Sequence, residues 1–400
     1  MPIITSMLDQ DLYKLTMAQC YMHRFSGATA KSEFKGRNTD ADLSQVYDRV
    51  RSEIYSLEGL RLSDDEAAYL ETIPFLKPDF IDFLYGFRLQ PERYVKMTKR
   101  PFKIEFGSDI CPIISESMFE IFSLAIVNEC YFDAVDPAPN YAGALAALDA
   151  KIKLADENPG FTYSEFGTRR RRSKRWQRTV LDRILTKQRT KALRGTSNVA
   201  FAKELGIKYE GTMGHELLQA AQSMTWLPNA QKWALDAWMQ EYQGNLGIAL
   251  SDVWGIDAFL ADFNSLYARM FDGVRHDSGD PFVWFDKVYA HYKRLGIDPK
   301  TKTVVFTDGL SFPKAIKLYN YVDNRMKTAF GIGTDLDNDF PGSKPLNIVV
   351  KMTECNGHPV AKISDSPGKA MCRDRVYTQY LHKVIDKKNK QYKILTNHKE

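Results

Sequence analysis

At 400 residues the chain is longer than one typical domain and can bury a large core, so we expect two domains. Its apolar fraction of 44% and charged fraction of 26% are ordinary for a soluble globular protein. No apolar run could span a membrane, no signal-peptide pattern opens the chain, and its five cysteines lack a C-x-x-C pair. These features exclude a membrane-spanning protein, argue against a disulfide framework or structural zinc, and predict a cytoplasmic protein with reduced thiols.

The first third of the chain mixes helical and strand patterns before a turn-rich segment. The apolar spacing predicts a helix over Asp9 to Arg24, a strand over Lys31 to Gly36, a helix over Asp42 to Leu60, strand-like alternation over Tyr94 to Phe106 and a buried helix over Phe119 to Cys130. The sequence Asp136-Pro137-Ala138-Pro139 is then a plausible domain boundary, because proline and aspartate interrupt regular structure.

The net charge of +5 hides a basic segment over residues 169–194, with twelve Lys and Arg residues against the single acid Asp182. Such a segment attracts anions, and either a nucleic acid or a polyanionic small substrate would explain it. A solvated helix face explains most of these side chains, since Trp176, Val180 and Ile184 give the same segment a buried stripe. Only the first arginines, directly after Phe166-Gly167-Thr168, are placed for a binding site.

Two loops of small and hydroxylated residues follow, Gly195-Thr196-Ser197-Asn198 and Gly211-Thr212-Met213-Gly214-His215-Glu216. Their exposed backbone N–H groups could approach an anion. His215 begins a helical pattern, and a lone histidine at a helix start is more often structural than catalytic. The pattern by itself leaves both roles open.

Alternating strands and helices dominate the region from residue 247 to 334. Asp252, Asp277, Asp308 and Gly331 each follow or end a short apolar strand, about one strand–helix unit apart. Asp280 is a suitable helix N-cap, with Pro281 at the first helical position. This spacing predicts a parallel sheet, open or closed, and both forms bind ligands at the carboxyl ends of their strands.

The remaining C-terminal segment contains a hairpin signal. Residues 347–352 and 359–363 are strand-like, and Asn356-Gly357 between them is a strong turn signal. The tail from Lys383 to Glu400 is polar and rich in lysine.

Taken together, the motifs of this chain resemble those of bacterial nicotinate phosphoribosyltransferases along essentially the whole sequence. The matching stretches are Asp9 to Met17, Phe166 to Arg170, Gly195 to Asn198, Gly211 to Glu216, Arg275 to Pro281, Phe330 to Thr334, Lys344 to Asn347 and Ser364 to Lys369. The resemblance implies an irregular α/β barrel of the type II phosphoribosyltransferase kind. It also implies a smaller α/β sandwich domain built from both termini, which we place at residues 1–135 and 346–400, with the barrel at 136–345.

The resemblance also implies the reaction. Nicotinate and 5-phosphoribosyl 1-diphosphate would give nicotinate mononucleotide and diphosphate in NAD biosynthesis, with ATP hydrolysis coupled through a transient phosphohistidine. The family's phosphohistidine lies in the motif matched by His215, and its nicotinate contacts match Tyr13, Thr212 and Arg275. Thr334 matches a threonine that contacts the phosphoribosyl group.

Further roles follow more loosely from the related nicotinamide enzymes. Phe166 would stack on the pyridine ring, and Arg169 would contact phosphate or diphosphate. The carboxylates of Asp252, Asp277 and Asp308 would face ribose, diphosphate or Mg²⁺. We expect Mg²⁺ to bind together with the diphosphate and not to protein ligands alone. We also expect Gly331, Gly333 and Thr334 to bind the 5-phosphate through backbone N–H groups.

Several alternatives stay open at this point. A phosphoribosyltransferase for nicotinamide or quinolinate is the nearest alternative, and a barrel aldolase or isomerase for sugar phosphates would explain the glycines but not His215. A nucleic-acid-binding protein would explain the basic segment but not the acids at the strand ends. We expect small-molecule substrates, with ATP as co-substrate, and neither nucleic acid nor membrane as a partner, and the resemblance is compatible with a homodimer.

Overall fold

The computed structural model describes residues 2–38, 40–363, 372 and 374–397, and its larger sheet is entirely parallel. The strand order is β6-β5-β4-β10-β9-β8-β7, and every adjacent pair runs in the same direction. Its strands are β4 (Tyr163–Glu165), β5 (Leu193–Thr196), β6 (Lys208–Tyr209), β7 (Ile248–Leu250), β8 (Gly273–His276), β9 (Thr303–Phe306) and β10 (Lys327–Ile332). The carboxyl ends of all seven strands therefore lie along one edge.

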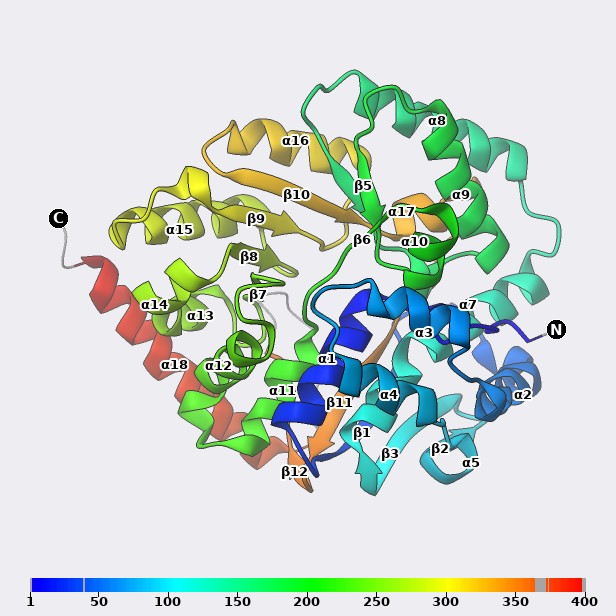
Figure 1. The fold of residues 1–400 in the computed structure, drawn as a ribbon, viewed down its shortest axis with the longest axis horizontal. Coiled ribbons are helices and arrows are strands. Elements are labelled where there is room, and N and C mark those ends of the chain that lie inside the picture. Colours follow the sequence, from blue (N-terminus) through cyan, green and yellow to red (C-terminus); the bar gives the residue numbers. More distant parts are fainter. Residues whose placement is uncertain (1, 39, 364–371, 373, 398–400) are drawn as a thin grey trace.

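Helices cover the outside of this curled sheet, as Figure 1 shows for α8, α15 and α16. The helices of this part are α8 (Tyr141–Asp156), α9 (Lys174–Lys187), α10 (Val199–Leu205), α11 (His215–Met224), α12 (Ala230–Tyr242), α13 (Ile256–Asp262), α14 (Ser265–Met270), α15 (Pro281–Arg294), α16 (Phe312–Val322) and α17 (Thr334–Asp337), with short 3₁₀ turns η3 (Thr168–Arg170), η4 (Leu227–Asn229) and η5 (Pro299–Thr301). The end strands β6 and β7 do not pair with each other within the described residues. The predicted irregular α/β barrel is thus confirmed as a curled parallel sheet that remains open.

The local signals at the start of α15 act as expected. The Asp280 carboxylate accepts hydrogen bonds from the backbone N–H groups of Phe282 (2.8 Å) and Val283 (3.1 Å), and Pro281 opens the helix. Gly296, with φ of 67°, follows the end of the helix in the left-handed conformation that glycine tolerates. The cap fixes where the loop after β8 ends and therefore limits where Asp277 can lie.

The second sheet is antiparallel and joins segments that are far apart in sequence. Its order is β12-β11-β1-β3-β2. The strands are β1 (Thr29–Gly36), β2 (Val95–Thr98), β3 (Lys103–Pro112), β11 (Ile348–Cys355) and β12 (His358–Pro359). The predicted hairpin forms at Asn356 and Gly357, both with positive φ, although its second strand is only two residues long.

The N-terminal helices pack around this second sheet. They are α1 (Leu12–Arg24), α2 (Tyr47–Ser56), α3 (Asp64–Glu71), α4 (Pro78–Gly86), α5 (Pro91–Tyr94), α6 (Ile113–Ser117) and α7 (Phe119–Val135), with the 3₁₀ turns η1 (Leu43–Val46) and η2 (Leu57–Gly59). The single helix predicted over residues 42–60 is therefore split into η1, α2 and η2. None of the described helices is both long and apolar enough to cross a bilayer.

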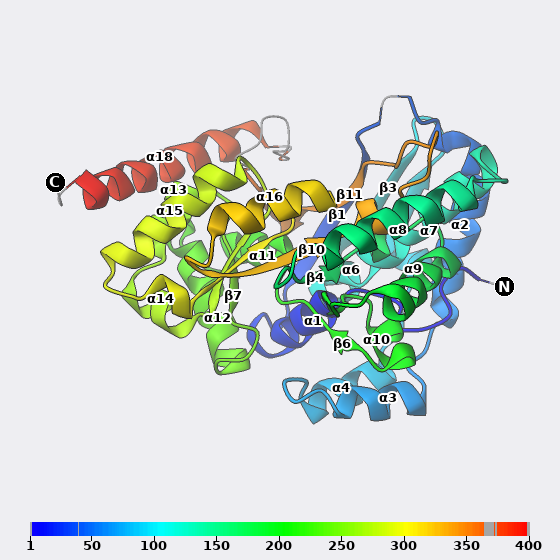
Figure 2. The ribbon, with the colours of Figure 1, turned by 90° about the horizontal axis from the view of Figure 1, so that it is seen from above.

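The two terminal helices are anchored differently. Helix α1 packs on α6 beside the second sheet and on α12 of the barrel part. The polar C-terminal tail forms α18 (Arg375–Asn397), which packs along α13 and is seen at the upper left of Figure 2. Its Lys388 ammonium is buried and contacts both carboxylate oxygens of Asp262 at 2.6 and 2.7 Å. The C-terminal helix is therefore anchored on the barrel part rather than on the second sheet.

Candidate active site

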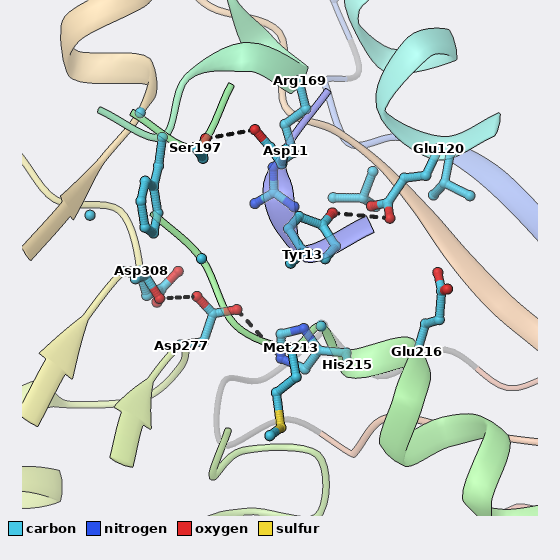
Figure 3. Close-up of a pocket in the computed structure, with 18 of the residues that line it drawn as sticks. Asp11, Tyr13, Glu120, Arg169, Ser197, Met213, His215, Glu216, Asp277 and Asp308 are labelled. Carbon is cyan, nitrogen blue, oxygen red and sulfur yellow. Dashed lines mark hydrogen bonds and ion pairs between the residues drawn. The ribbon is translucent and has the colours of Figure 1, made fainter. Parts of the chain in front are cut away.

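A cavity of about 370 Å³ lies at the carboxyl edge of the parallel sheet, and residues of α1 and β11 complete its wall. Most of the side chains predicted from the sequence meet here, and Figure 3 shows several of them converging on the same space. The predicted residues that line the cavity are Tyr13, Phe166, Arg169, Thr212, His215, Arg275, Asp277, Asp308, Gly331, Gly333 and Thr334. The motif from Ser364 to Lys369 lies outside the described residues.

Glycines make room for both aromatic side chains of the cavity. A Cβ on Gly331 would come within 2.4 Å of the Phe166 ring, and one on Gly333 would come within 2.6 Å of the Phe166 carbonyl oxygen. Across the cavity, a Cβ on Gly214 would meet the Tyr13 ring at 3.0 Å. Glycine at 331 is therefore needed to seat the Phe166 ring, glycine at 333 lets the Phe166 backbone approach, and glycine at 214 eases the packing of the Tyr13 ring.

Tyr13 is positioned by residues of its own chain. Its hydroxyl donates to Glu120 Oε2 at 3.2 Å, and the same carboxylate oxygen contacts Lys14 Nζ at 2.7 Å. Lys14 is fully buried and also contacts Glu216 Oε2 at 2.6 Å. An ion-paired chain thus runs from Tyr13 to the first turn of α11.

The four-arginine run from Arg169 to Arg172 divides into one half that lines the cavity and one half that is paired inside the fold. Arg169 and Arg170 line the cavity, as expected for the arginines directly after Phe166. Burial lowers the pKa of Arg169, but the neighbouring Tyr13 and Glu120 side chains outweigh it, so that its pKa is raised. Burial and the charges of Arg169 and Arg37 lower the pKa of Arg170 to about 9. This wall of the cavity therefore concentrates positive charge that an anionic ligand would offset.

The second half of the run is structural. Arg171 is fully buried and donates to Asp9 Oδ1 at 2.6 Å and to Glu129 Oε1 at 2.9 Å. Arg172 contacts Asp136 Oδ2 at 2.5 Å, and its guanidinium lies 4.1 Å from the centre of the Phe132 ring. Farther along, the side chains of Arg178, Arg183, Lys187, Arg189 and Arg194 all form ion pairs with acids. Internal pairing thus explains most of the basic segment without a polyanionic partner.

Arg275 and Asp277 project from the end of β8. Arg275 Nη1 donates to the Met213 carbonyl oxygen at 3.0 Å, whereas its buried Nε has no hydrogen-bond partner among the described residues. Asp277 Oδ1 accepts from Thr307 Oγ1 at 2.6 Å. Burial would raise the pKa of Asp277, but His215 and Arg275 lower it to about 2. The cavity therefore holds a guanidinium with unused donor capacity beside a carboxylate that is ionised at neutral pH.

His215 lies at the centre of a compact polar cluster. Its Nε2 is 2.8 Å from Asp252 Oδ1, 2.7 Å from Lys362 Nζ and 3.4 Å from Asp277 Oδ2. Burial, and next the charge of Lys362, lower the pKa of His215 to about 4. The imidazole is therefore neutral at pH 7, and a neutral imidazole is a competent nucleophile.

Asp252 has a different position from the other two strand-end aspartates. It is 1% exposed, does not line the cavity, and accepts hydrogen bonds from Ser278 Oγ (2.6 Å) and Lys362 Nζ (2.6 Å). The resemblance to the related nicotinamide enzymes implies that Asp252 faces ribose, diphosphate or Mg²⁺, but this side chain lies behind His215 instead. Strand-end position alone does not reveal which side chains a neighbouring loop covers.

Three side chains of this cluster could by number and distance hold a metal ion. Ligand atoms of His215, Asp252 and Asp277 lie within 4.8 Å of one another. The Lys362 ammonium, however, already contacts both His215 and Asp252. A second cation there would be repelled by the lysine, so the cluster is better suited to hold a neutral imidazole in place than to bind a metal.

Several cavity residues were not predicted from the sequence. They include Asp11, Ser32, Arg37, Glu120, Ser197, Lys351 and Lys362. Burial, and next the charge of Lys362, lower the pKa of Lys351 to about 7. One signal was available, because Lys351 interrupts the apolar strand from Ile348 to Met352 and a lysine is rarely buried without a reason.

Comparisons with known proteins agree with this geometry. The family model described as the nicotinate phosphoribosyltransferase (NAPRTase) family matches residues 161–389, and the model of its N-terminal domain matches residues 8–128. The nicotinate phosphoribosyltransferase of Cupriavidus necator is 47% identical over 391 residues, which cover 96% of this chain and 98% of that protein. That of Neisseria meningitidis serogroup C is also 47% identical, over 398 residues with the same coverage.

Solved structures show the same similarity. A crystal structure of nicotinate phosphoribosyltransferase from Vibrio cholerae superposes with a TM-score of 0.90 at 38% identity, covering 96% of this chain and 94% of that one. The corresponding structure from Porphyromonas gingivalis gives a TM-score of 0.90 at 33% identity, with coverage of 96% and 100%.

Proposed function

Because the chain belongs to the nicotinate phosphoribosyltransferase family, we propose that it couples phosphoribosyl transfer to ATP hydrolysis through a phosphohistidine at His215. The transfer itself joins nicotinate to 5-phosphoribosyl 1-diphosphate and gives nicotinate mononucleotide and diphosphate, a step of NAD biosynthesis. The observation that carries the coupling is a neutral imidazole that lines the substrate cavity and contacts a buried carboxylate at 2.8 Å.

The cavity provides the groups that the transfer needs. The pyridine nitrogen of nicotinate attacks C1 of the ribose with its lone pair, the C–N bond forms, and the bond from C1 to the diphosphate oxygen breaks. Diphosphate leaves with that electron pair, and no proton moves, so no general base is required. Tyr13 and Phe166 would hold the flat ring, while Arg169 and Arg170 stabilise the charge that builds up on the leaving group.

Arg275 accounts for the choice of an acid over an amide. Its guanidinium uses one nitrogen for the Met213 carbonyl oxygen and leaves the buried Nε without a partner in the described part of the chain. A carboxylate would accept from such a donor fork and neutralise its charge, whereas a carboxamide would not neutralise it. This favours nicotinate over nicotinamide at this position.

Mg²⁺ fits the acidic side of the cavity. The carboxylate oxygens of Asp277 and Asp308 line it, and Asp277 is ionised at neutral pH. Such hard oxygen donors suit Mg²⁺, which would be held together with the diphosphate oxygens and would neutralise part of their charge. The two carboxylates would then orient the leaving group opposite the arginines.

The coupling step can be written with this chain's own atoms. Asp252 would accept the proton on Nε2, which leaves the lone pair on Nδ1 free to attack the γ-phosphorus of ATP. The N–P bond forms, the bond to the bridging oxygen breaks, and ADP leaves with that electron pair. Attack of water on phosphohistidine later releases phosphate and restores the imidazole. A phosphoryl group adds roughly two negative charges beside Lys362. These charges would change the affinity of this part of the site for its substrates.

Labelled ATP tests the coupling directly. The unaltered protein should acquire acid-labile, base-stable label and should make the mononucleotide faster with ATP than without it. His215→Ala should lose the label and the ATPase activity while slow synthesis without ATP survives. His358→Ala, at an exposed histidine of β12, is the matched control and should be labelled normally. Label that persists on His215→Ala would place the phosphoryl group elsewhere.

The location is inferred on separate grounds. All five cysteines are free thiols in the structure, and Cys20, Cys111, Cys130 and Cys355 are buried. Reduced, unpaired cysteines are typical of the cytoplasm, where we infer that the enzyme works.

A further inference from the structure

Lys362 caps one nitrogen of the nucleophile proposed above. Its Nζ lies 2.7 Å from His215 Nε2 and 2.6 Å from Asp252 Oδ2, and the residue is only 6% exposed. An ammonium group donates hydrogen bonds but cannot accept them. When Lys362 donates to Nε2, that nitrogen must be unprotonated, and the ring proton is on Nδ1. The imidazole then has no free lone pair.

Asp252 imposes the opposite arrangement. Its Oδ1 is 2.8 Å from the same Nε2 and can only accept a proton from it. The carboxylate and the ammonium therefore compete for one nitrogen, and only the arrangement with the proton facing Asp252 leaves Nδ1 free to attack. The position of Lys362 decides how often the nucleophile is available.

The backbone beside Lys362 is held by one side chain of α11. Gln222 Nε2 donates to the Ala361 carbonyl oxygen at 2.7 Å, and the Ala361 N–H donates back to Gln222 Oε1 at 2.9 Å. Tyr377 of α18 donates to the same Oε1 at 2.6 Å. On the other side of Lys362, the Ile363 N–H donates to the Val253 carbonyl oxygen at 2.7 Å, which ties the segment to the loop that carries Asp252.

Gln222 and His215 also share a helix. His215 is the first residue of α11, and Gln222 follows seven positions later, close to two full turns. The two side chains therefore project from nearly the same face. Gln222 holds the backbone of Ala361, the residue before the lysine, and His215 receives the lysine's ammonium. This bidentate amide contact fixes the backbone from which the Lys362 side chain reaches His215.

We infer that Gln222, braced by Tyr377, is a positioning residue that holds Lys362 against His215. It thereby reduces the fraction of time for which Nδ1 has a free lone pair, until an anionic ligand draws the ammonium away. The consequence for catalysis rests on the proposed phosphorylation of His215, but the positioning itself does not. Gln222 does not line the cavity and so acts only through Lys362.

The test measures the nucleophilicity of His215 without ATP. Diethyl pyrocarbonate acylates a neutral imidazole through a free lone pair, and peptide mass spectrometry reports the rate at His215. Gln222→Met removes both amide hydrogen bonds at similar volume, and we expect about a tenfold faster reaction, because the ammonium is then held less often against Nε2. Lys362→Met should accelerate the reaction at least as much, and Gln222→Met should add nothing in that background.

Controls separate positioning from general damage. Gln231→Met removes a buried amide of α12 that donates to Ala258 and Asp262, and should leave His215 reactivity unchanged. If Gln222→Met fails to fold by circular dichroism, Tyr377→Phe removes only the bracing hydroxyl, and a two- to threefold acceleration is expected.

Two outcomes would overturn the inference. One is unaltered His215 reactivity in Gln222→Met, or in Tyr377→Phe where that variant replaces it. The other is an equal acceleration by Gln222→Met with and without Lys362. Failure of the unaltered protein to take label from ATP would instead refute the coupling. The acylation rates would still test the positioning role of Gln222, because they do not depend on phosphorylation.

Discussion

The contact between Gly331 and Phe166 gives a direct test of the ring-binding site. Gly331 is in β10 and does not have positive φ, so alanine adds no backbone strain there. Its Cβ, however, would lie 2.4 and 2.7 Å from two carbons of the Phe166 ring, whereas carbon atoms normally approach to about 3.5–4.0 Å. The ring must therefore move by about 1 Å in Gly331→Ala.

The expected loss follows from what the ring contributes. Aromatic stacking is worth about 0.5–1.5 kcal/mol beyond the buried area. Its removal should raise the KM for nicotinate about 2- to 12-fold, at about 1.4 kcal/mol per factor of ten. The KM for phosphoribosyl diphosphate should change little, because the displaced group is the ring.

Steady-state kinetics with each substrate varied in turn measures both constants. Gly86→Ala is the matched control, since its new Cβ would meet nothing within 4 Å. In a Phe166→Ala background the Gly331→Ala substitution should lose most of its effect. If the full effect persists without the ring, or if the KM for phosphoribosyl diphosphate rises instead, Gly331 contacts phosphate and the reasoning from ring displacement is wrong.

Three more predictions follow from the same cavity. Arg275→Ala should raise the KM for nicotinate about 10- to 150-fold, because hydrogen bonds to charged groups contribute about 1.5–3 kcal/mol, and equal use of nicotinamide by the unaltered enzyme would contradict this role. Binding of the anionic phosphoribosyl diphosphate should weaken as pH rises through about 7, where buried Lys351 loses its charge, and titration calorimetry should find no such step in Lys351→Met. Since Tyr13 and the barrel residues line one cavity of a single chain, specific activity should not fall on dilution to nanomolar enzyme, whereas a loss on dilution would indicate a site shared between subunits.

The sequence predicts the parallel part of the fold well because its signals are local. Short apolar strands, an Asp–Pro helix start and strand-end acids recur within one strand–helix unit, and none of these patterns depends on distant residues. The same holds for the hairpin turn at Asn356 and Gly357. Strand-end position was therefore enough to bring Asp277, Asp308 and Gly331 to one cavity.

Long-range pairing explains what could not be predicted. Arg171 is removed from the site by Asp9 and Glu129, which are 162 and 42 residues away in sequence. Asp252 follows the same local pattern as Asp277, yet Lys362, 110 residues later, covers it. The family resemblance identified His215, but no local pattern could show that a C-terminal lysine contacts its ring.

The two C-terminal lysines connect ATP use with substrate binding. Lys362 lowers the pKa of Lys351, and both lysines lower the pKa of His215. In the unmodified site, a positive charge on any of these three groups therefore disfavours protonation of the others. A phosphoryl group on His215 would add roughly two negative charges and reverse that sign. Lys351 would then hold its proton to higher pH, so the weakening of phosphoribosyl diphosphate binding near pH 7 should move upward when ATP is present. An unchanged step in the presence of ATP would mean that modification of His215 does not act through these lysines, because a modification shifts an equilibrium only through its differential interaction with the two states.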